Sequence, residues 1–521
     1  MPRALDLRLG IDVGGTNTDA VVLDRQDRVL ATSKVSTTPD VTSGIASAIA
    51  GAVGREAVPA HRITHVMLGT THATNAILEQ RDLQRVAVVR IGGPATHAIP
   101  PLATWPDHLR RAVSAGEVIV QGGLEFDGRE LAPFAPDQLA RFLESLEPPV
   151  DAVAVTGVFA PVSDRHEREA EEVVHRVLGE VPVSLSAEIG SVGLLERENA
   201  TVLNAVLTRV ARRFAEALER SLAASGIDAV TYFTQNDGTL MALDYVLSHP
   251  VLTIGSGPAN SMRGAAHLTG LDDAVVADIG GTSTDVGALS NGFPRQSAIP
   301  VEVCGVRTNF RMPDILSIPL GGGTRIHPTP DGLRLGPDSV GYRLRREACA
   351  FGGGTPTLTD AAVFVGRADL GVHPNGTWPR GVPWERAMER ADEMLAEAID
   401  RVKMSGHPVP LVMVGGGSII APDRIPGVSE IVRPPHFEVA NAIGAAIAQV
   451  SGQVERVYHL GTRSREAALE EVCRMAADEA VRAGADPQSV QIVDVEELTI
   501  AYLTGPALRI RARAAGALGS L

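Results

Sequence analysis

The most constraining feature of this chain is an octapeptide that occurs twice. Asp12-Val-Gly-Gly-Thr-Asn-Thr-Asp19 returns as Asp278-Ile-Gly-Gly-Thr-Ser-Thr-Asp285, 266 positions later (278 minus 12), with six of eight positions identical. Each copy follows an apolar run, which predicts a buried strand that ends in an acidic residue, a tight glycine turn and hydroxyl groups. Two such turns facing each other can hold one polyphosphate with its metal. The repeat therefore predicts two related lobes around one nucleotide.

Length and charge limit the classes of protein that the chain can belong to. Its 521 residues are too many for one compact core and predict two or three domains. A hydrophobic share of 44% and a charged share of 21% are typical of a globular α/β enzyme. The net charge of −15 argues against binding to nucleic acid or to an anionic membrane. An aromatic share of 4% also leaves few platforms for stacking bases.

Cysteine and histidine spacing gives no sign of a metal cluster or a disulfide framework. The three cysteines are far apart and form no CxxC pair, so we expect buried, reduced thiols: Cys304, Cys349 and Cys473. The histidines that lie near the motifs show no metal-ligand spacing. The amino terminus lacks an apolar leader, and no stretch reaches the roughly 18 apolar residues that a membrane helix needs. We expect a cytoplasmic protein.

The pattern of apolar residues predicts strands that alternate with helices through most of the chain. In the first half we expect strands at 7–13, 19–24, 29–35, 86–91, 152–158 and 181–184, helices at 42–53, 137–147, 165–178 and 194–224, and a hairpin over 116–131. Over 65–79 we expect a strand that runs into a helix through a Gly/Thr turn. In the second half we expect a lobe that starts near Ala229, strands at 274–277 and 410–414, and helices at 383–402, 439–450 and 465–483. A βαβ-sized tail is expected over 490–495, 499–503 and 507–512. The fold class is therefore α/β, with two lobes and a small tail. The predicted domains are 1–190, 191–455 and 456–521.

The two repeated turns carry the predicted chemistry. Glycines let the backbone approach phosphate oxygens, while amides and hydroxyls supply hydrogen-bond donors. A carboxylate at a strand end can hold Mg²⁺ directly or through water. The alternative for both turns is a duplicated hairpin without a ligand.

Three other segments have two interpretations each, and a fourth is a candidate for ligand contacts. Gly415-Gly416-Gly417 follows a buried strand and suits close contact with an adenine ring, or it is a plain strand-to-helix connection. Gly69 to Asn75 places hydroxyls at a helix start, which predicts either a substrate site or a cap. The segment Glu196 to Asn199 lies at the start of the long helix, and it is either a ligand site or a solvent-exposed face. The loop Gly321 to Thr324, with Asp314, is a further candidate for ligand contacts.

Several segments taken together resemble a known family. In chain order they are LGIDVGGTNTDAVV, GTTHATNAILE, ERENATVLNA, GSGPAN, VADIGGTSTDV, IPLGGGTRI, LTDAAVFVGR and ANAIGAA. The phosphate turns and the late glycine loop resemble the actin-like ATPase and sugar-kinase superfamily, with ribonuclease H-like lobes around a nucleotide cleft. The full set resembles the ATP-binding (A-like) subunit of the hydantoinase/oxoprolinase family, over about residues 7–450.

The resemblance implies a function and a set of site residues. Members couple ATP hydrolysis to opening of a cyclic amide such as hydantoin, N-methylhydantoin, 5-oxoproline or a lactam. The resemblance implies ATP and Mg²⁺ as cofactors, with Mn²⁺ or a monovalent cation as alternatives. It makes Asp12, Asp278 and Asp285 catalytic, with Asp12 and Asp278 holding the metal. The implied phosphate-binding residues are Gly14, Gly15, Thr16, Asn17, Gly280, Gly281, Thr282 and Ser283. Gly415, Gly416 and Gly417 would contact adenosine, and the implied substrate residues are Thr70, Thr71 and Asn75.

The resemblance also implies a partner and leaves alternatives open. Oxoprolinases fuse this part to a second large half, so a separate hydantoinase B-like subunit is expected here, in a homo- or hetero-oligomer. The segments GSGPAN and SIPLGGGTRI depart from the usual family pattern, which leaves the substrate undecided. The alternatives are the ATPase subunit of an acetone- or acetophenone-type ketone carboxylase, a small-molecule kinase, and a non-catalytic, regulatory nucleotide-binding module.

Overall fold

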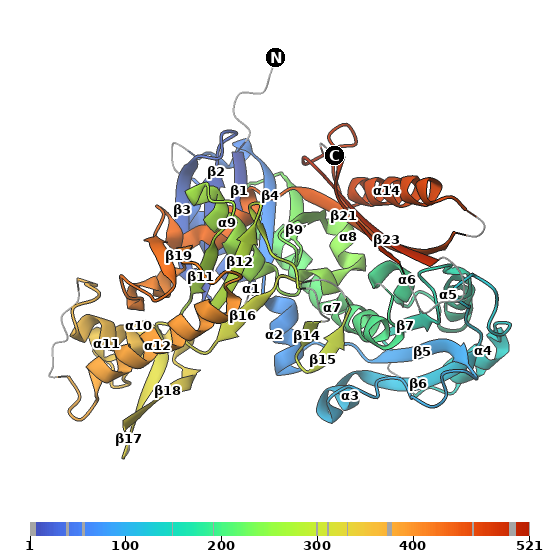
Figure 1. The fold of residues 1–521 in the computed structure, drawn as a ribbon, viewed down its shortest axis with the longest axis horizontal. Helices are drawn as coiled ribbons and strands as arrows, with labels where there is room; N and C mark the ends of the chain where they lie inside the picture. Colours follow the sequence, from blue (N-terminus) through green and yellow to red (C-terminus); the bar gives the residue numbers. More distant parts are fainter. Residues whose placement is uncertain are drawn as a thin grey trace.

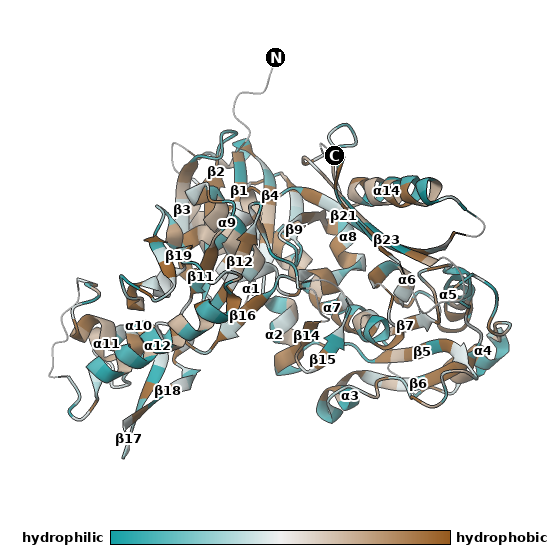
Figure 2. Cartoon of the chain, viewed as in Figure 1, coloured by the Kyte–Doolittle hydropathy of each residue, from teal (hydrophilic) through white to brown (hydrophobic). Residues whose placement is uncertain are grey.

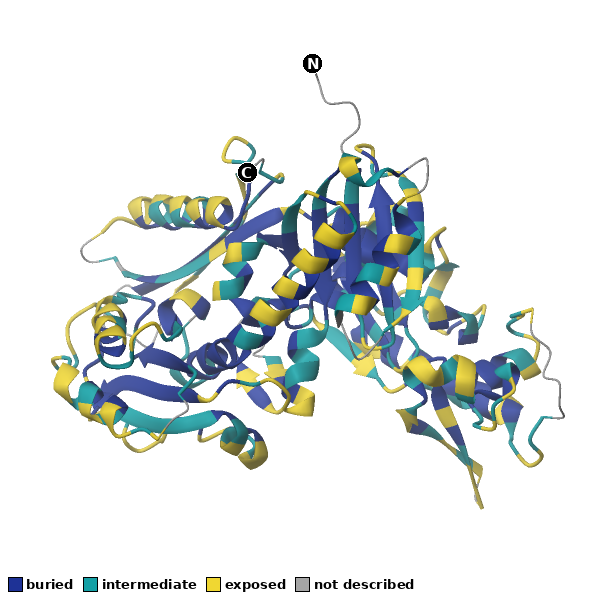
Figure 3. Cartoon of the chain, turned by 180° about the vertical axis from the view of Figure 1, so that it is seen from behind, coloured by how far each residue is buried: buried dark blue, intermediate teal, exposed yellow. Residues whose placement is uncertain are grey.

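A computed structural model describes most of the chain. The described residues are 7–519, except 38–40, 55–57, 148–149, 191, 298–300, 310–311, 331, 372–377, 461–462 and 500–506. Three sheets with helices packed on them make up the mixed α/β architecture, and the buried residues concentrate in the strands of these sheets (Figure 3). Within the described ranges, no helix is long and apolar enough to span a membrane.

The largest sheet has nine strands, in the order β22-β23-β21-β10-β9-β4-β1-β2-β3. Their bounds are β1 (Leu7–Val13), β2 (Asn17–Leu23), β3 (Val29–Ser36), β4 (Ile63–Thr70), β9 (Val230–Thr234), β10 (Leu240–Ala242), β21 (Val450–His459), β22 (Gln491–Thr499) and β23 (Ala507–Gly516). One face packs against three apolar helix faces, from α1 (Val41–Ala52), α7 (Leu194–Ala224) and α14 (Arg465–Arg482). The C-terminal strands thus extend the first sheet, whereas the domain boundaries near 190 and 455 stay a prediction.

The second sheet has four parallel strands, in the order β6-β5-β7-β8. They are β5 (Val86–Gly93), β6 (Ser114–Gln121), β7 (Ala152–Gly157) and β8 (Val183–Leu185). The helices beside them are α3 (Asp107–Val113), α4 (Pro136–Glu144), α5 (Arg165–Leu178) and α6 (Ser186–Ile189). The predicted hairpin over 116–131 is wrong, because β6 pairs in parallel with β5 and only an isolated bridge joins Leu124 to Glu130. The turn residues there close a small loop after β6 instead of a strand pair.

The third sheet has the order β13-β12-β11-β19-β20, and β16 also pairs with β12. Its strands are β11 (Val275–Ile279), β12 (Thr284–Ser290), β13 (Phe293–Pro294), β16 (Ile315–Ile318), β19 (Val409–Val414) and β20 (Val428–Val432). The helices of this half are α9 (Ser256–Thr269), α10 (Leu344–Glu347), α11 (Leu358–Phe364), α12 (Trp384–Val402) and α13 (Ala440–Ala446). Two small strand pairs stand apart, β14 (Val301–Val303) with β15 (Val306–Thr308) and β17 (Thr324–Thr329) with β18 (Gly332–Ser339). Two short helices complete the chain, α2 (His72–Glu79) and α8 (Leu243–Ser248).

The sequence repeat is also a structural repeat. β1 pairs with β2 antiparallel and with β4 in parallel, and β11 pairs with β12 antiparallel and with β19 in parallel. In both hairpins the two acidic residues of the octapeptide lie directly opposite each other, Asp12 with Asp19 and Asp278 with Asp285. The two lobes therefore share one strand plan around each glycine turn.

Helix α9 (Figure 1) lies against helix α13, and the two helices contact the sheets of both lobes. The contact is so close that a Cβ on Gly444 would lie 1.8 Å from the carbonyl oxygen of Asn260. α13 also packs on β1, while α9 packs on β11 and β19. Small residues in both helices thus allow one helix pair to touch both sheets, and this places polar side chains of both helices near the turns.

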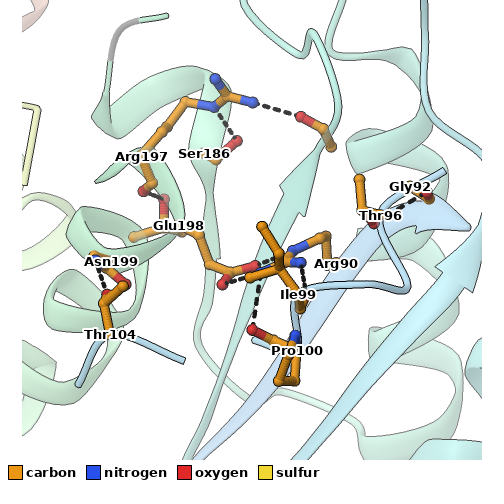
Figure 4. A network of polar contacts seen from close by, with 12 residues as sticks. Arg90, Gly92, Thr96, Ile99, Pro100, Thr104, Ser186, Arg197, Glu198 and Asn199 are labelled. Atoms are coloured by element: carbon orange, nitrogen blue, oxygen red, sulfur yellow. Dashed lines mark hydrogen bonds and ion pairs between the residues drawn. The ribbon is translucent and has the colours of Figure 1, made fainter. Parts of the chain in front are cut away.

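A buried ion pair and buried hydrogen bonds hold the second sheet on α7 and account for the ERENA segment (Figure 4). The Nε and Nη2 atoms of Arg90 donate to the two carboxylate oxygens of Glu198, at 2.6 and 2.7 Å, and both side chains are buried. Arg197 donates to Ser186 and to the carbonyl of Gly157. The start of the long helix is therefore neither a solvated face nor a ligand site; it is an internal clamp. The apolar side of α7 packs against β5 and β7, and Figure 2 shows the hydropathy of these elements.

Candidate functional site

The two repeated turns face each other across the contact between the lobes. Each turn closes in the same way, with Gly14 N donating to Asn17 O at 3.0 Å and Gly280 N to Ser283 O at 2.9 Å. A Cβ built on Gly281 would lie 3.1 Å from the Cγ2 atom of Thr16. Gly15 and Thr282 are exposed at the tips of the two turns. The structure thus brings together all eight residues predicted to cradle phosphate.

The first turn ends in a pair of buried carboxylates that share one amide. The Nδ2 atom of Asn441 donates to Asp12 Oδ2 and to Asp19 Oδ2, both at 2.9 Å. Asn260 Nδ2 lies 3.4 Å from Asp12 Oδ1. Lys34 donates to both oxygens of Asp19, at 2.7 and 2.9 Å, and also to the carbonyl of Glu438. The lysine neutralises Asp19, whereas Asp12 receives neutral amides only.

The electrostatics of Asp12 follow from that difference. Burial, the nearby Asp19 carboxylate and, to a smaller extent, Asp278 raise the pKa of Asp12 to about 7. Hydrogen bonds from Asn260 and Asn441 act in the opposite direction. Burial also raises the pKa of Asp19, although Lys34 opposes that shift. Near neutral pH, Asp12 is therefore poised to exchange a proton or to ionise beside a cation.

The second turn repeats the pattern with hydroxyl donors. Ser261 Oγ donates to Asp278 Oδ2 at 2.5 Å, and Ser317 donates to Asp285. Burial raises the pKa of Asp278, and burial together with the charge of Asp278 raises the pKa of Asp285 to about 6. Both turns thus carry carboxylates whose negative charge is poorly compensated within the protein.

The Gly415-Gly416-Gly417 loop lies directly on the second turn. Gly415 has φ +83°, and a Cβ there would lie 2.3 Å from Asp278 Oδ1 and 2.5 Å from the carbonyl of Ile279. A Cβ on Gly417 would lie 2.2 Å from the carbonyl of Gly280. These glycines are required for contact between two backbone segments. Their predicted contact with adenosine stays a prediction.

The Gly321 to Thr324 loop braces the second turn from the other side. Gly322 N donates to Gly280 O at 3.0 Å, and Gly323 N donates to Gly281 O at 2.7 Å. Thr359 holds this loop by donating twice to Gly322 O. Asp360 belongs to the capping box of α11, the helix that contains Thr359, and it also accepts a hydrogen bond from Ala350 N. The LTDAA and GGGT segments therefore support the second turn together. Asp314, the other residue named with this loop, instead pairs with Arg295.

The predicted substrate residues lie beside the first turn. Thr71 N donates to Val13 O at 3.1 Å, which ties the start of α2 to the end of β1. Asn75 Nδ2 is 3.3 Å from Thr71 Oγ1 and would lie 3.9 Å from a Cβ on Gly15. Thr70 Oγ1 accepts from His72 N, a capping contact. Asn75 and Thr71 therefore lie next to the first turn. Their contact with a substrate stays a prediction.

Sequence reasoning did not assign roles to several polar residues of this site: Asp19, Lys34, Asn260, Ser261, Ser317 and Asn441. Asn260 ends the GSGPAN segment and Asn441 is the second residue of ANAIGAA, so both lie within segments that carry the family resemblance. An asparagine in the first turn of a helix that is otherwise rich in small residues was the available signal. Lys34 carried no such signal, because only strand pairing places it opposite Asp19.

The donor set suits a hard divalent cation that also binds phosphate oxygens. Within the described part of the chain, no three His, Cys, Asp or Glu side chains converge as a complete metal cage. Mg²⁺ usually takes only one or two carboxylates and completes its coordination with phosphate oxygens and water. The pKa values of Asp12 and Asp278 are raised because the protein compensates their negative charge poorly, and a bound cation would compensate it. The residues present therefore fit Mg²⁺ bound together with a polyphosphate.

Of the three cysteines predicted to be buried and reduced, only Cys349 is fully buried. Within the described residues the three thiols form no disulfide; Cys349 is buried, and the other two are half-buried. Burial raises the pKa of the Cys349 thiol to about 11, which keeps it protonated at neutral pH.

Comparison with known proteins gives a consistent result. A family model described as the hydantoinase/oxoprolinase N-terminal region matches residues 8–178, and one described as hydantoinase/oxoprolinase matches residues 197–382. The caprolactamase subunit alpha of Pseudomonas jessenii is 28% identical over 478 residues, covering 86% of this chain and 67% of that protein. The acetophenone carboxylase gamma subunit of Aromatoleum aromaticum is 25% identical over 509 residues, covering 86% and 69%. This chain thus spans about two thirds of the length of each of these relatives.

A solved structure supports the fold. The crystal structure of the ATP-dependent caprolactamase from Pseudomonas jessenii superposes with a TM-score of 0.72 at 21% identity. The superposition covers 98% of this chain and 87% of that one. The arrangement of lobes that is seen here is therefore the arrangement of that ATP-dependent enzyme.

Proposed function

The chain belongs to the hydantoinase/oxoprolinase family, and from this we propose that it is the ATP-binding and ATP-hydrolysing subunit of an ATP-dependent cyclic-amide hydrolase. The substrate would be a hydantoin, N-methylhydantoin, 5-oxoproline or lactam ring. The subunit would activate the amide carbonyl by phosphorylation before the ring is opened.

One observation carries this proposal: two glycine turns of closely similar sequence face each other, and each is backed by a pair of carboxylates, buried at the first turn and half-buried at the second. Backbone amides at both tips supply donors to phosphate oxygens from two sides. A single turn would suit many ligands, but two facing turns suit a chain of phosphates that bridges them. The relative named caprolactamase then directs the choice of acceptor toward a cyclic amide.

The chemistry requires activation because an amide carbonyl is a poor electrophile. If the carbonyl oxygen attacks the γ-phosphorus of ATP, ADP leaves and the amide N–H loses its proton, which gives an imidate phosphate. Water then adds to the imidate carbon, and the adduct expels the ring nitrogen as an amine, leaving an acyl phosphate. A second water releases phosphate and the open-chain acid. Positioning and charge neutralisation carry such a transfer.

The residues of this chain would divide that work. Gly14 to Asn17 and Gly280 to Ser283 would bind phosphate oxygens, and the Gly415 to Gly417 loop would border adenosine. Mg²⁺ held by Asp12 and Asp278 would neutralise charge on the transferring phosphoryl group. Asp12, with its pKa about 7, is suited to hold a proton or to orient water, and Asp285 would support Asp278. Thr70, Thr71 and Asn75 would contact the amide at the edge of the first turn.

A partner subunit completes the proposal. The relatives include proteins named as subunits, caprolactamase alpha and acetophenone carboxylase gamma. We infer that a separate hydantoinase B-like subunit carries out the later hydrolytic steps, in a hetero-oligomer. A cytoplasmic location stays a prediction.

A second candidate function is the ATPase subunit of a ketone carboxylase, which the acetophenone carboxylase relative favours. The phosphate site would be the same, because an enolate oxygen would take the place of the amide oxygen as phosphoryl acceptor. The difference lies in the co-substrate, since carboxylation consumes bicarbonate.

The proposal predicts that cyclic amides stimulate ATP turnover by the purified subunit. ATP hydrolysis is measured with hydantoin, 5-oxoproline, caprolactam or acetophenone, each with and without bicarbonate. Stimulation by a cyclic amide in the absence of bicarbonate is the expected result. Stimulation by the ketone that depends on bicarbonate would establish the carboxylase alternative instead. ATP binding without stimulation by any acceptor, even with the partner subunit present, would indicate a regulatory module.

A further inference from the structure

A large cavity in the described structure lies away from the phosphate turns. It has a volume of about 890 Å³ and is lined by residues of the C-terminal strands β21 and β23 and of the helices α6 and α8. Figure 1 shows where these elements lie. β21 pairs with β10 only at Val450, so its edge beyond that residue is left open toward the cavity. The volume is within the range of pockets that enclose small organic ligands.

Strand β23 gives this cavity an arginine-rich wall. Ile510, Ala512 and Ala514 belong to the core cluster on the face of the sheet that α14 covers. The alternating residues Arg509, Arg511 and Arg513 line the cavity. Because a strand presents alternate residues to opposite faces, the sequence LRIRARA encodes an apolar face and a cationic face at once.

The three arginines differ in how well they are neutralised. Arg511 lies 2.9 Å from Asp494, and Arg509 lies 3.6 Å from Glu455. The nearest carboxylate to Arg513 is Asp237, at 3.9 Å. That carboxylate already accepts from Thr239 N at 2.9 Å and from Thr239 Oγ1 at 2.5 Å. Positive charge therefore remains under-compensated at the Arg513 end of the cavity.

A second guanidinium increases this excess. Arg263 stacks on Phe293 at 3.9 Å, and Arg513 lies over the same ring at 5.7 Å. Burial and the charge of Arg513 both lower the pKa of Arg263, while Asp237 opposes them. Two cations thus share one carboxylate, which leaves a net charge of about +1 at this end.

The same end holds donors without acceptors. Asn236 lines the cavity with 5% of its surface exposed, and its Nδ2 atom is buried with no hydrogen-bond partner in the described structure. The Nε atom of Arg513 is buried and likewise has no partner there. Both atoms, Asn236 Nδ2 and Arg513 Nε, are N–H donors beside an excess positive charge. A buried donor without an acceptor destabilises the folded protein. Their common complement is an anionic oxygen.

We propose that this cavity binds a small organic carboxylate, whose oxygens accept from Asn236 and Arg513. A carboxylate is planar and carries one negative charge, which matches a guanidinium, a neighbouring amide and a net charge of about +1. A phosphate dianion would exceed that charge. The site is separate from the ATP site and does not depend on the proposed reaction.

The test is a calorimetric titration of the full chain in the absence of nucleotide. The probes are pentanoate, its uncharged isostere pentanamide, and inorganic phosphate. Pentanoate is expected to bind and pentanamide is not. Arg513→Gln and Asn236→Asp should each weaken pentanoate binding by about 10-fold or more, through loss of a charged donor or through repulsion. Arg81→Gln, which removes an exposed arginine that pairs with Glu79, should leave binding unchanged.

The contrary outcomes are distinct. Absence of pentanoate binding, equal binding of pentanamide, or a preference for phosphate would each overturn the proposal. Unchanged affinity in Arg513→Gln would also overturn it. If the buried substitution at Asn236 prevents folding, Arg513→Gln decides the question, because that side chain is 20% exposed and its removal is tolerable.

Discussion

Replacing Asp12 with asparagine is expected to abolish most ATP turnover while making the nucleotide-free protein more stable above pH 7. The loss of rate should be about 10²- to 10⁴-fold, since the side chain would lose its capacity to hold a cation or a proton beside the phosphates. The gain in stability follows from burial, because asparagine has nearly the same shape and no charge to desolvate.

The sign of this stability change follows from how the ionisation of Asp12 affects folding at each pH. The pKa of Asp12 is raised from 3.8 to about 7 in the folded protein. Below pH 4 both folded and unfolded chains carry the proton, so burial of this group costs least there. Between pH 4 and 7 the unfolded chain releases the proton first, and stability falls by up to about 1.4 kcal/mol per pH unit from this group. Above pH 7 the loss is complete.

The measurement compares urea unfolding of wild type and Asp12→Asn at pH 5 and pH 8, without nucleotide or metal. The variant should gain about 1–3 kcal/mol over wild type at pH 8, because one amide hydrogen bond to Asn260 or Asn441 is lost in exchange. Asp423→Asn, at a side chain that is 97% exposed, is the matched control and should show no such gain. Equal free energies of unfolding for wild type and Asp12→Asn at pH 8 would show that burial of the Asp12 charge does not destabilise the protein. Full ATP turnover in the variant would show that Asp12 does not belong to the ATP site.

Glu198→Ala is expected to cost about 3–5 kcal/mol of folding free energy, the largest effect on stability of any single change considered. The substitution leaves Arg90, which is 0% exposed, without its counter-ion. Two remaining acceptors, the carbonyls of Ile99 and Pro100, do not replace a carboxylate. The clamp between β5 and α7 should therefore open first when the variant is stressed.

Unfolding in urea, followed through tryptophan fluorescence, measures this effect. Trp105 donates to Asn199, the residue after Glu198, and so reports on the clamp. Glu389→Ala removes one partner of an exposed pair with Arg386 and should leave the free energy of unfolding nearly unchanged. The double variant Arg90→Met with Glu198→Leu should recover much of the loss, since no charge is left buried. A loss no larger than that of the control would show that the clamp does not hold the second sheet.

Much of the fold was predictable because its signals are local. The glycine turns, the strands that precede them and the long helix at 194–224 follow from apolar spacing and turn residues. The segment 499–503 of the predicted βαβ-sized tail lies mostly outside the described residues. The hairpin over 116–131 failed because turn chemistry does not reveal the partner of a strand, and β6 found β5 in parallel.

The finer parts of the site were not predictable, because they depend on contacts between distant segments. Asn441 reaches Asp12 across 429 positions, and only the packing of α13 on β1 brings them together. The polar start of α7 was expected either to be solvated or to bind a ligand, yet its partner Arg90 lies 108 positions away in a buried strand. A charged segment carries no local mark that distinguishes a surface from an internal ion pair.

The central claim is that both repeated turns belong to one ATP site, and calorimetric titration with ATP and Mg²⁺ tests it most directly. Gly15→Asp and Thr282→Asp each place a negative charge at one exposed turn tip, where side chains do not disturb the core. Wild type should bind one ATP per chain, and each variant should lose that same binding event through repulsion of phosphate. Two ATP molecules per chain, or normal binding in either variant, would contradict a single site built from both turns.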